Sequence, residues 1–226
     1  MQLADAVTTT SGPLADCYRD FGARSVHVLE NYVPDAAAEV DSRGGQRVVV
    51  GWTAASEHRY DHDALRLREV LQRLLDTHPQ VEVRGIGIPL GLRGDRYTNL
   101  GLVQFTELPR AVAGFDVGLA PIADNAFNRA RSNVKLKEYA AAGVPWLASP
   151  IGPYAGMGEK QGGRLVPDDR WYEEIERLVL DHRGRRKLAK RAKKWGRSQV
   201  ISKHVGAWEQ MLKDAVAARA AAAALT

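Results

Sequence analysis

The sequence predicts an α/β fold in which helices cover both faces of a parallel β-sheet and a helical tail follows. Short apolar runs alternate with segments of helical period along most of its 226 residues. Residues 115–122, 132–143 and 144–149 give the order strand, helix, strand, which is typical of a parallel sheet with its site at the strand ends. With 45% hydrophobic residues, the chain can bury the core of one large domain.

The expected elements follow one another without an internal repeat. Each strand is a short apolar run bounded by turn residues, and each helix carries apolar residues at spacings of three and four. In the first long helix, for example, Leu67, Leu71 and Leu74 share one side, and Pro79 ends the pattern. In chain order we expect strands near 5–9 and 25–29 around a helix over 14–22, a polar connector over 35–46, a helix over 61–78, strands over 81–86 and 102–105, a helix over 108–113, strands within 115–122, 144–149 and 163–167, and helices over 171–182, 185–198 and 202–218.

The net charge of +5 comes from one basic stretch. Residues 183–203 hold ten Lys or Arg and no Asp or Glu, so the rest of the chain is net acidic. Within the stretch, Leu188, Ala192 and Trp195 recur at helical spacing, which favours a helix with one packed face and a solvated basic face. Binding of nucleic acid or another anionic polymer is the alternative, although no nucleic-acid motif accompanies the charges.

The composition excludes several classes of protein. No uninterrupted apolar run could span a bilayer, and the N-terminus lacks a basic region followed by an apolar one. We therefore expect a cytoplasmic protein, with peripheral membrane contact left open. Cys17 is the single cysteine, which excludes an intrachain disulfide and a cysteine-based zinc cluster. It is expected to be a small, partly buried residue of a helix.

The stretch from Arg131 to Pro145 has the features of an anion site at a helix N-terminus. Ser132 is a suitable N-cap, and the N–H groups of the first turn after it would favour a phosphate. Lys135 and Glu138 lie three residues apart on one side of this helix, and its other side would pack. On spacing alone the two charges form an ordinary surface pair. The strands predicted on either side of the helix favour a ligand site instead.

A second polar cluster contains His58, Asp61, His62 and Asp63. Two His and two Asp could indicate a metal, but their spacing matches no zinc signature. Asp61 or Asp63 is expected to cap the helix that follows. His58 remains as a residue on the phosphate side of the site.

The sequence resembles the donor-binding domain of the GT-B glycosyltransferases, in particular the large retaining family called group 1 or GT4. The acceptor domain of that family is almost entirely absent. The match runs in the family's order through residues 4–15, 26–34, 48–56, 115–122 and 132–149. The resemblance implies a Rossmann-like sheet, with residues 1–34 as a remnant of the N-terminal domain and its crossing segment, 35–46 as a connector, 47–200 as the donor domain, and 201–226 as the crossing helix and an Ala-rich tail.

The chemistry implied by the resemblance is transfer of a sugar, as in hexosyltransferases, from a nucleotide diphosphate donor with retention of configuration. Fixed positive groups would stabilise the charge that develops on the diphosphate, without a metal or other cofactor. The groups expected to meet that charge are Lys135, the amides of Ser132 and Asn133, and the backbone from Gly51 to Thr53. Lys135 and Glu138 are the expected catalytic residues. A glycine at position 51 would let backbone approach the phosphates.

Glu138 matches the second glutamate of the family's Glu-x7-Glu motif, which contacts the ribose hydroxyls. A carboxylate is suited to accept hydrogen bonds from two hydroxyls. At the position of the first glutamate this chain has Ala130. Asp124 and Asn128, in the loop before it, are the polar residues that could bind sugar hydroxyls instead, although such residues commonly form turns.

Three hypotheses follow. The first is the donor-binding half of a glycosyltransferase, which acts with a separate acceptor-binding chain or with a shortened N-terminal segment. The second is a nucleotide-sugar binding module without catalysis, motivated by Ala130. The third is an anionic-polymer binder that uses residues 183–203. Uridine, guanosine and adenosine diphosphate sugars all fit the first hypothesis.

Overall fold

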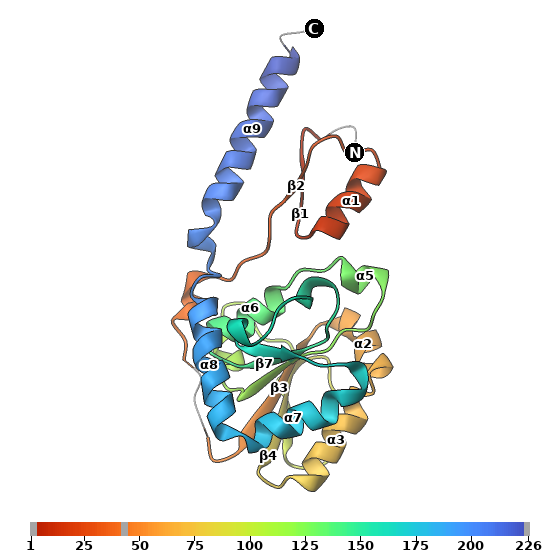
Figure 1. The fold of residues 1–226 in the computed structure, drawn as a ribbon, viewed down its shortest axis with the longest axis vertical. Coiled ribbons are helices and arrows are strands. Elements are labelled where there is room, and N and C mark those ends of the chain that lie inside the picture. The colour runs from red at the N-terminus through yellow and green to blue at the C-terminus, as the bar shows by residue number, and fades with distance from the viewer. Residues whose placement is uncertain (1–3, 42–44, 224–226) are drawn as a thin grey trace.

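The computed structural model describes residues 4–41 and 45–223, which fold into two parts (Figure 1). The larger part holds a parallel sheet with helices on both faces, as the sequence predicts. The smaller part holds two strands and a helix. Positions 1–3, 42–44 and 224–226, which belong to the expected remnant, connector and tail, lie outside the described residues.

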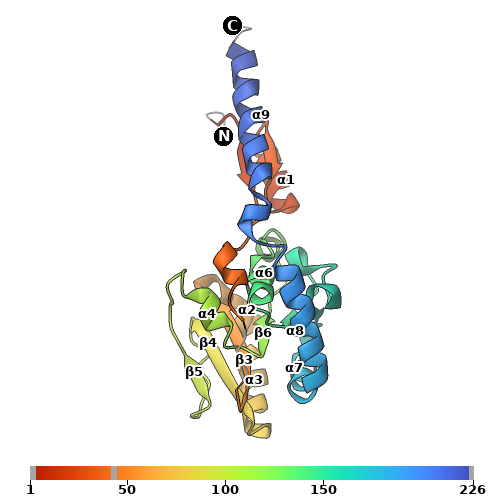
Figure 2. The same cartoon turned by 90° about the vertical axis from the view of Figure 1, so that its left-hand side faces the viewer.

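The main sheet contains six parallel strands in the order β5-β4-β3-β6-β7-β8. The central strand, β3, pairs with β4 on one side and β6 on the other, so that Gly51 lies opposite both Arg84 and Gly118. Strand β5 forms one edge, and α7 and α8 lie toward the other (Figure 2). The bounds are β3 Val48–Ala54, β4 Val81–Gly87, β5 Tyr97–Asn99, β6 Val117–Ala120, β7 Trp146–Ala148 and β8 Gly163–Leu165.

Seven α-helices follow or separate these strands within the described residues. Alternate side chains of β3 enter two cores, because successive residues of a strand point to opposite faces. Val50 and Trp52 pack with α3 and α7, whereas Val49 packs with α4 and α6. The helices are α2 Arg59–Ala64, α3 Leu67–Thr77, α4 Leu108–Val112, α5 Ala126–Arg129, α6 Val134–Ala141, α7 Trp171–Leu180 and α8 His182–Gly196.

The smaller part combines the two ends of the chain. Strands β1, Val7–Thr9, and β2, Val26–Val28, pair in parallel around α1, Gly12–Asp20. The long helix α9, Val205–Ala223, reaches the same region, where Arg219 pairs with Asp5 at 2.8 Å. As far as Ala223 the tail thus continues the final helix, one of the two outcomes expected for it.

Three side chains of this part show how far it is packed. Met211 of α9 is buried, whereas Trp208 on the same helix is 39% exposed. Cys17 lies exposed on α1, so the expectation that it would be partly buried is wrong. Its position on the outer side of a nine-residue helix explains the difference.

Two segments that connect the parts run side by side. Val33 forms a parallel bridge with Val200, and Asp35 of the short helix η1, Asp35–Ala38, bonds Ser202 of η6, Ile201–Lys203. The rings of Tyr32 and His204 stack with centroids 3.6 Å apart.

Buried Lys137 of α6 ties one of these segments to the main part. Its ammonium donates to the Glu30 carboxylate at 2.7 Å and to the Asn31 carbonyl at 2.8 Å. The same nitrogen lies 4.0 Å from the centre of the Tyr32 ring. A buried lysine with a carboxylate, a carbonyl and an aromatic face as partners is well compensated.

Two element predictions are wrong. The helix expected over 61–78 is broken, because Arg66 takes a left-handed conformation with φ of 49° between α2 and α3. No strand forms over 102–105, where Leu102 is 89% exposed, and the strand beside β4 is Tyr97–Asn99 instead. The apolar side chains of that loop face a cavity described below and do not enter the sheet.

The basic stretch forms most of α8, and several of its charges have structural partners. Arg191 pairs with Glu159, and Lys193 donates to the carbonyls of Val40 and Ala141. Leu188 and Ala192 are buried and Trp195 is partly buried, which confirms the predicted packed face.

Arg185 is the most strongly structural of these basic residues. Its buried guanidinium donates to the carbonyls of Leu178 and Val179 at 2.6 and 2.7 Å and so caps the end of α7. Replacing Arg185 by alanine leaves two carbonyls without donors, and we expect the free energy of unfolding to fall by about 1–3 kcal/mol. Urea denaturation measures it. The exposed neighbour Lys187→Ala serves as control and should change it by less than about 0.5 kcal/mol. Equal effects of the two substitutions would contradict the capping role.

Candidate functional site

A cavity of about 320 Å³ opens at the carboxyl ends of β3 and β4, beside the start of α6. Such a position is the usual one for ligands of open parallel sheets. One wall is polar and comes from α6 and the loop before it, and the opposite wall is apolar. Its lining consists of Thr53, Ala54, Ala55, Glu57, Ile86, Gly87, Leu102, Val103, Leu108, Arg131, Ser132, Val134, Lys135, Glu138 and Tyr154.

Lys135 lies in the first turn of α6 with its ammonium at the polar wall. The nitrogen donates to the Thr53 carbonyl at 2.6 Å and lies 2.9 Å from Nε2 of His58. Burial, together with the positive charge of Arg131, lowers the pKa of Lys135 to about 7. Glu138 opposes this shift. A lysine with a pKa of about 7 is partly deprotonated at neutral pH, and it gains a proton when an anion binds beside it.

Glu138 follows one turn later on the same side of α6. Burial raises the pKa of its carboxyl from the usual value, and the charge of Lys135 opposes the shift. Its side chain also borders a smaller, mostly apolar cavity formed with Tyr32 and Phe105. Two ionisable groups of opposite sign therefore share one water-poor wall, a feature of functional sites.

Arg131 completes the positive side of the cavity. One terminal nitrogen, Nη2, lies 2.9 Å from Nε2 of His58 and donates to Glu57 at 3.3 Å. The other terminal nitrogen, Nη1, is buried and has no hydrogen-bond partner among the described residues. Arg131 therefore keeps one donor without a partner among the described residues, just beneath the cavity surface.

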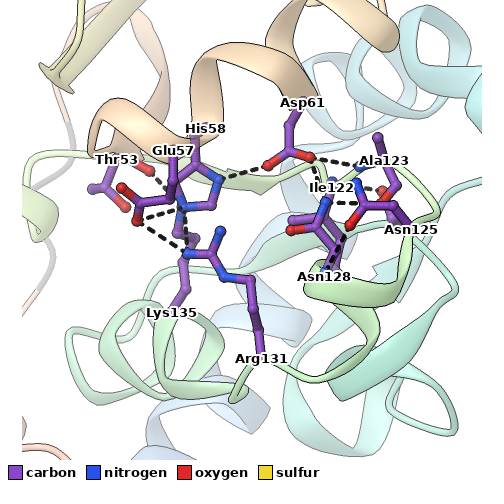
Figure 3. Close-up of polar contacts among 11 residues, drawn as sticks. Thr53, Glu57, His58, Asp61, Ile122, Ala123, Asn125, Asn128, Arg131 and Lys135 are labelled. Atoms are coloured by element: carbon purple, nitrogen blue, oxygen red, sulfur yellow. Dashed lines mark hydrogen bonds and ion pairs between the residues drawn. The ribbon is translucent and has the colours of Figure 1, made fainter.

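A second layer of polar residues supports these cations (Figure 3). Asp61 of α2 is buried, and one carboxylate oxygen lies 2.9 Å from Nδ1 of His58. The other oxygen accepts from the Ala123 amide at 2.8 Å and from the Asn128 amide side chain at 2.6 Å. Burial raises the pKa of Asp61, but these hydrogen bonds outweigh it, so the pKa lies below its usual value.

The same layer sets the charge of His58, whose side chain is almost fully buried. Burial lowers the pKa of the imidazole. The charges of Lys135 and Arg131 lower it further, and Asp61 opposes them. At neutral pH the ring is therefore neutral.

The structure places some predicted site residues at the cavity. Thr53, Ser132, Lys135 and Glu138 line it, and Asn133 borders a neighbouring cavity. His58 lies directly behind Lys135 and acts through it. The predicted roles of these residues toward a ligand stay predictions.

The predicted position of Gly51 in a turn is corrected by the structure. It lies in the middle of β3 rather than in a turn, and a side chain there would overlap the Phe115 ring at 2.1 Å. The glycine provides space for core packing, not for phosphates.

The predicted caps and the predicted sugar-binding loop are also corrected. Asn133, not Ser132, precedes α6, and it makes no side-chain cap bond; Ser132 accepts from Asn31. Asp124 points outward and pairs with Arg129 at 2.6 Å. Asn128 is buried because its amide holds Asp61, and Asp61 lies inside α2 rather than capping a helix.

Sequence reasoning did not assign a role to Arg131 or Glu57, or to the apolar wall formed by Ile86, Leu102 and Val103. One signal for Arg131 was present, since it precedes Lys135 by four residues and thus adds a second cation to the helix start. The apolar wall had no local signal, because its residues come from β4 and a loop.

Ala130, at the position of the missing glutamate, contacts the smaller part of the molecule. Its carbonyl accepts a hydrogen bond from the Ser11 hydroxyl at 2.6 Å. A cavity of about 480 Å³ lies at this junction and shares Arg131 and Ser132 with the first one. A ligand could therefore extend from one cavity into the other.

Over residues 4–41 and 45–223, no three His, Cys, Asp or Glu gather closely enough to hold a metal ion. None of the helices within those ranges combines the length and apolar character that crossing a membrane requires. Function without a metal stays a prediction.

No family model and no curated protein matches the sequence. Solved structures match its architecture. HepE of Anabaena, solved with UDP and glucose, superposes with a TM-score of 0.71 at 15% identity over 93% of this chain and 63% of that chain. Sucrose-phosphate synthase of Thermosynechococcus elongatus gives 0.68 at 16% identity over 95% of this chain and 59% of that chain.

A third similar structure is that of an isolated domain. The C-terminal domain of the group 1 glycosyl transferase LpcC of Francisella tularensis gives a TM-score of 0.55 at 14% identity, over 75% of this chain and 96% of that domain. This chain spans less than two thirds of the two longer proteins and almost all of the isolated domain. The protein therefore has the fold of the C-terminal domain of a GT-B glycosyltransferase of group 1.

Proposed function

We propose that this protein is the donor-binding part of a retaining glycosyltransferase that uses a nucleotide diphosphate sugar. One observation carries the proposal: Lys135, Arg131 and Glu138 meet at the cavity at the carboxyl ends of the strands. Two cations suit a diphosphate, and a carboxylate one helical turn away suits a ribose. The solved structures of the same fold include one with UDP and glucose, which supports this choice of ligand.

The walls of the cavity suggest how such a donor would lie. The diphosphate would occupy the polar wall between Lys135 and the free donor of Arg131, near the first amides of α6. Glu138 would accept from the ribose hydroxyls. The base would lie against the apolar wall formed by Ile86, Leu102 and Val103.

The same contacts would assist the transfer step. Cleavage of the bond between sugar and phosphate leaves negative charge on the diphosphate. Lys135 and Arg131 stabilise that charge more strongly in the transition state than in the bound donor. Retention of configuration and the GT4 assignment rest on the sequence resemblance. A separate acceptor-binding chain or domain would bind the acceptor. The cytoplasmic location remains a prediction.

A nucleotide-sugar binding module without catalysis is the second candidate. Ala130 favours it, because the carboxylate expected toward the donor sugar is missing and its backbone instead contacts Ser11. Anionic-polymer binding through residues 183–203 has less support, since Arg185, Arg191 and Lys193 serve the fold. Measurable sugar transfer by this protein would exclude the module.

The proposed donor site is tested by calorimetric titration with UDP, GDP, ADP and pyrophosphate. We expect one nucleotide to bind. Glu138→Gln should weaken binding of that nucleotide at least about 10-fold, the size of one charge-assisted hydrogen bond. Binding of pyrophosphate should be unchanged, because pyrophosphate has no ribose. The exposed Glu173→Gln on α7 is the matched control. Failure of all nucleotides to bind would overturn the proposed function.

The pKa of Lys135 predicts how nucleotide affinity depends on pH. In the free protein this pKa is about 7, and a bound diphosphate raises it, so binding takes up a proton above pH 7. The proton taken up by Lys135 should therefore lower affinity for the nucleotide diphosphate by at most about 10-fold per pH unit as pH rises from 7 to 9. Lys135→Arg, which stays charged, should flatten the profile. A profile that is already flat in the unmodified protein would contradict this assignment.

A further inference from the structure

We propose that His58 takes up a proton when the donor diphosphate binds and becomes a third cation of the site, with Asp61 as the residue that positions it. The inference rests on the proposed function of the cavity. It concerns the layer behind Lys135 and Arg131, which the proposed function itself does not use.

The hydrogen bonds at both ends of the ring assign one tautomer to His58. Asp61 is ionised, because its carboxylate accepts from the Ala123 amide and the Asn128 side chain. Facing this acceptor, Nδ1 of His58 must carry the hydrogen and donate to it. On the other side, the guanidinium of Arg131 offers only a donor to Nε2 at 2.9 Å, and the Lys135 nitrogen lies at the same distance. Nε2 therefore presents its lone pair, and the free ring is neutral.

The charges around the ring explain why this neutral form is stable without a ligand. Lys135 and Arg131 both face Nε2, and either would repel a proton placed there. Glu57 is more distant, at 4.0 Å from Nε2, and its carboxylate pairs more closely with Arg131, at 3.3 Å. The remaining neighbour is the edge of Trp52, with ring centroids 6.5 Å apart. Burial adds to the same effect and lowers the pKa of the ring.

A bound diphosphate reverses each of these conditions. Its oxygens compete for the donors of Lys135 and Arg131, so the lone pair of Nε2 loses its partners. The negative charge of the diphosphate, on the cavity side of these two side chains, favours a proton on Nε2. One proton passes from solvent to Nε2, no other bond forms or breaks, and the imidazolium then lies between the diphosphate and the ionised Asp61.

Asp61 is essential to this arrangement through its charge. An asparagine would preserve the shape but could donate its amide hydrogen to Nδ1, which would move the ring hydrogen to Nε2, directly against two cations. The Asp61→Asn variant should therefore lose the proton uptake by His58 and weaken nucleotide binding at least 10-fold. A residue needed only for folding would lower stability without changing the number of protons taken up.

The experiment is nitrogen NMR on protein labelled with ¹⁵N-histidine, at pH 7, with and without UDP and pyrophosphate. The chain has six histidines, and the His58→Gln variant assigns the signal. We expect the Nδ1–H neutral form in the free protein and protonation of both nitrogens in the complex. His78, paired with Glu176 beyond α3, serves as internal control and should not shift.

Calorimetry in two buffers of different ionisation enthalpy then counts the protons taken up on binding. The His58→Gln variant should take up fewer protons than the unmodified protein, and the remainder belongs to Lys135. Nucleotide binding that leaves the His58 signal neutral would overturn this inference alone. Absence of any nucleotide binding would overturn the proposed function and this inference with it.

Discussion

Substitution of Lys135 by methionine is expected to weaken nucleotide diphosphate binding and sugar transfer by about 10²-fold or more. Methionine keeps most of the apolar length of the side chain, so the loss is that of the charge. The ammonium lies at the cavity wall, where its hydrogen-bond partners are the Thr53 carbonyl and His58. In a water-poor cavity, such a charge interacts with a phosphate more strongly than in solvent.

Isothermal calorimetry with UDP measures the effect, and circular dichroism verifies that the variant folds. Lys187→Met is the matched control, because this lysine is exposed on α8 and distant from the cavity. The control should bind as the unmodified protein does. An unchanged affinity of Lys135→Met would place the diphosphate elsewhere.

Substitution of Gly196 by alanine is expected to lower the free energy of unfolding by about 1–3 kcal/mol. Gly196 ends α8 where this helix crosses α6, and a Cβ there would lie 2.4 Å from backbone atoms of Ala140 and Ala141. Backbone cannot move aside as a flexible side chain can, so the helices must separate. Because α6 carries Lys135 and Glu138, nucleotide binding should weaken as well.

Thermal and urea denaturation measure this change. Gly206→Ala is the control, since nothing lies within 4 Å of the added carbon and the residue belongs to α9. Alanine there should stabilise the protein slightly, by at most about 1 kcal/mol. If Gly196→Ala were equally harmless, α6 and α8 could not be packed as closely as described.

The sequence contained enough information for the fold and for part of the site. Lys135 and Glu138 could be predicted because one helix carries both and strands flank it. Gly51 could not be assigned correctly, because a glycine beside phosphates and a glycine beneath an aromatic ring look alike in sequence. Only the position of Phe115 across the sheet distinguishes them.

The supporting layer of the site is a tertiary feature. Asp61 meets the Ala123 amide and Asn128 across more than sixty residues of chain. Its spacing from His58, three residues on a helix, was compatible with a cap, a metal ligand or a ring partner. Local pattern alone does not separate these roles, because the deciding partners lie between β6 and α6, Ala123 in a loop and Asn128 in α5.

The paired crossing segments limit how the two parts of the molecule can move. Val33 and Val200 are bridged, and Asp35 is bonded to Ser202, so both covalent connections pass through one small region. Two connections at one place form a hinge, which permits rotation about a single axis and resists translation of one part along the other. Lys137 attaches this hinge to α6, the helix that also carries Lys135 and Glu138. Any rotation of the smaller part therefore has its axis next to the proposed donor site. Such a rotation first changes the width of the junction cavity at Arg131 and Ser132.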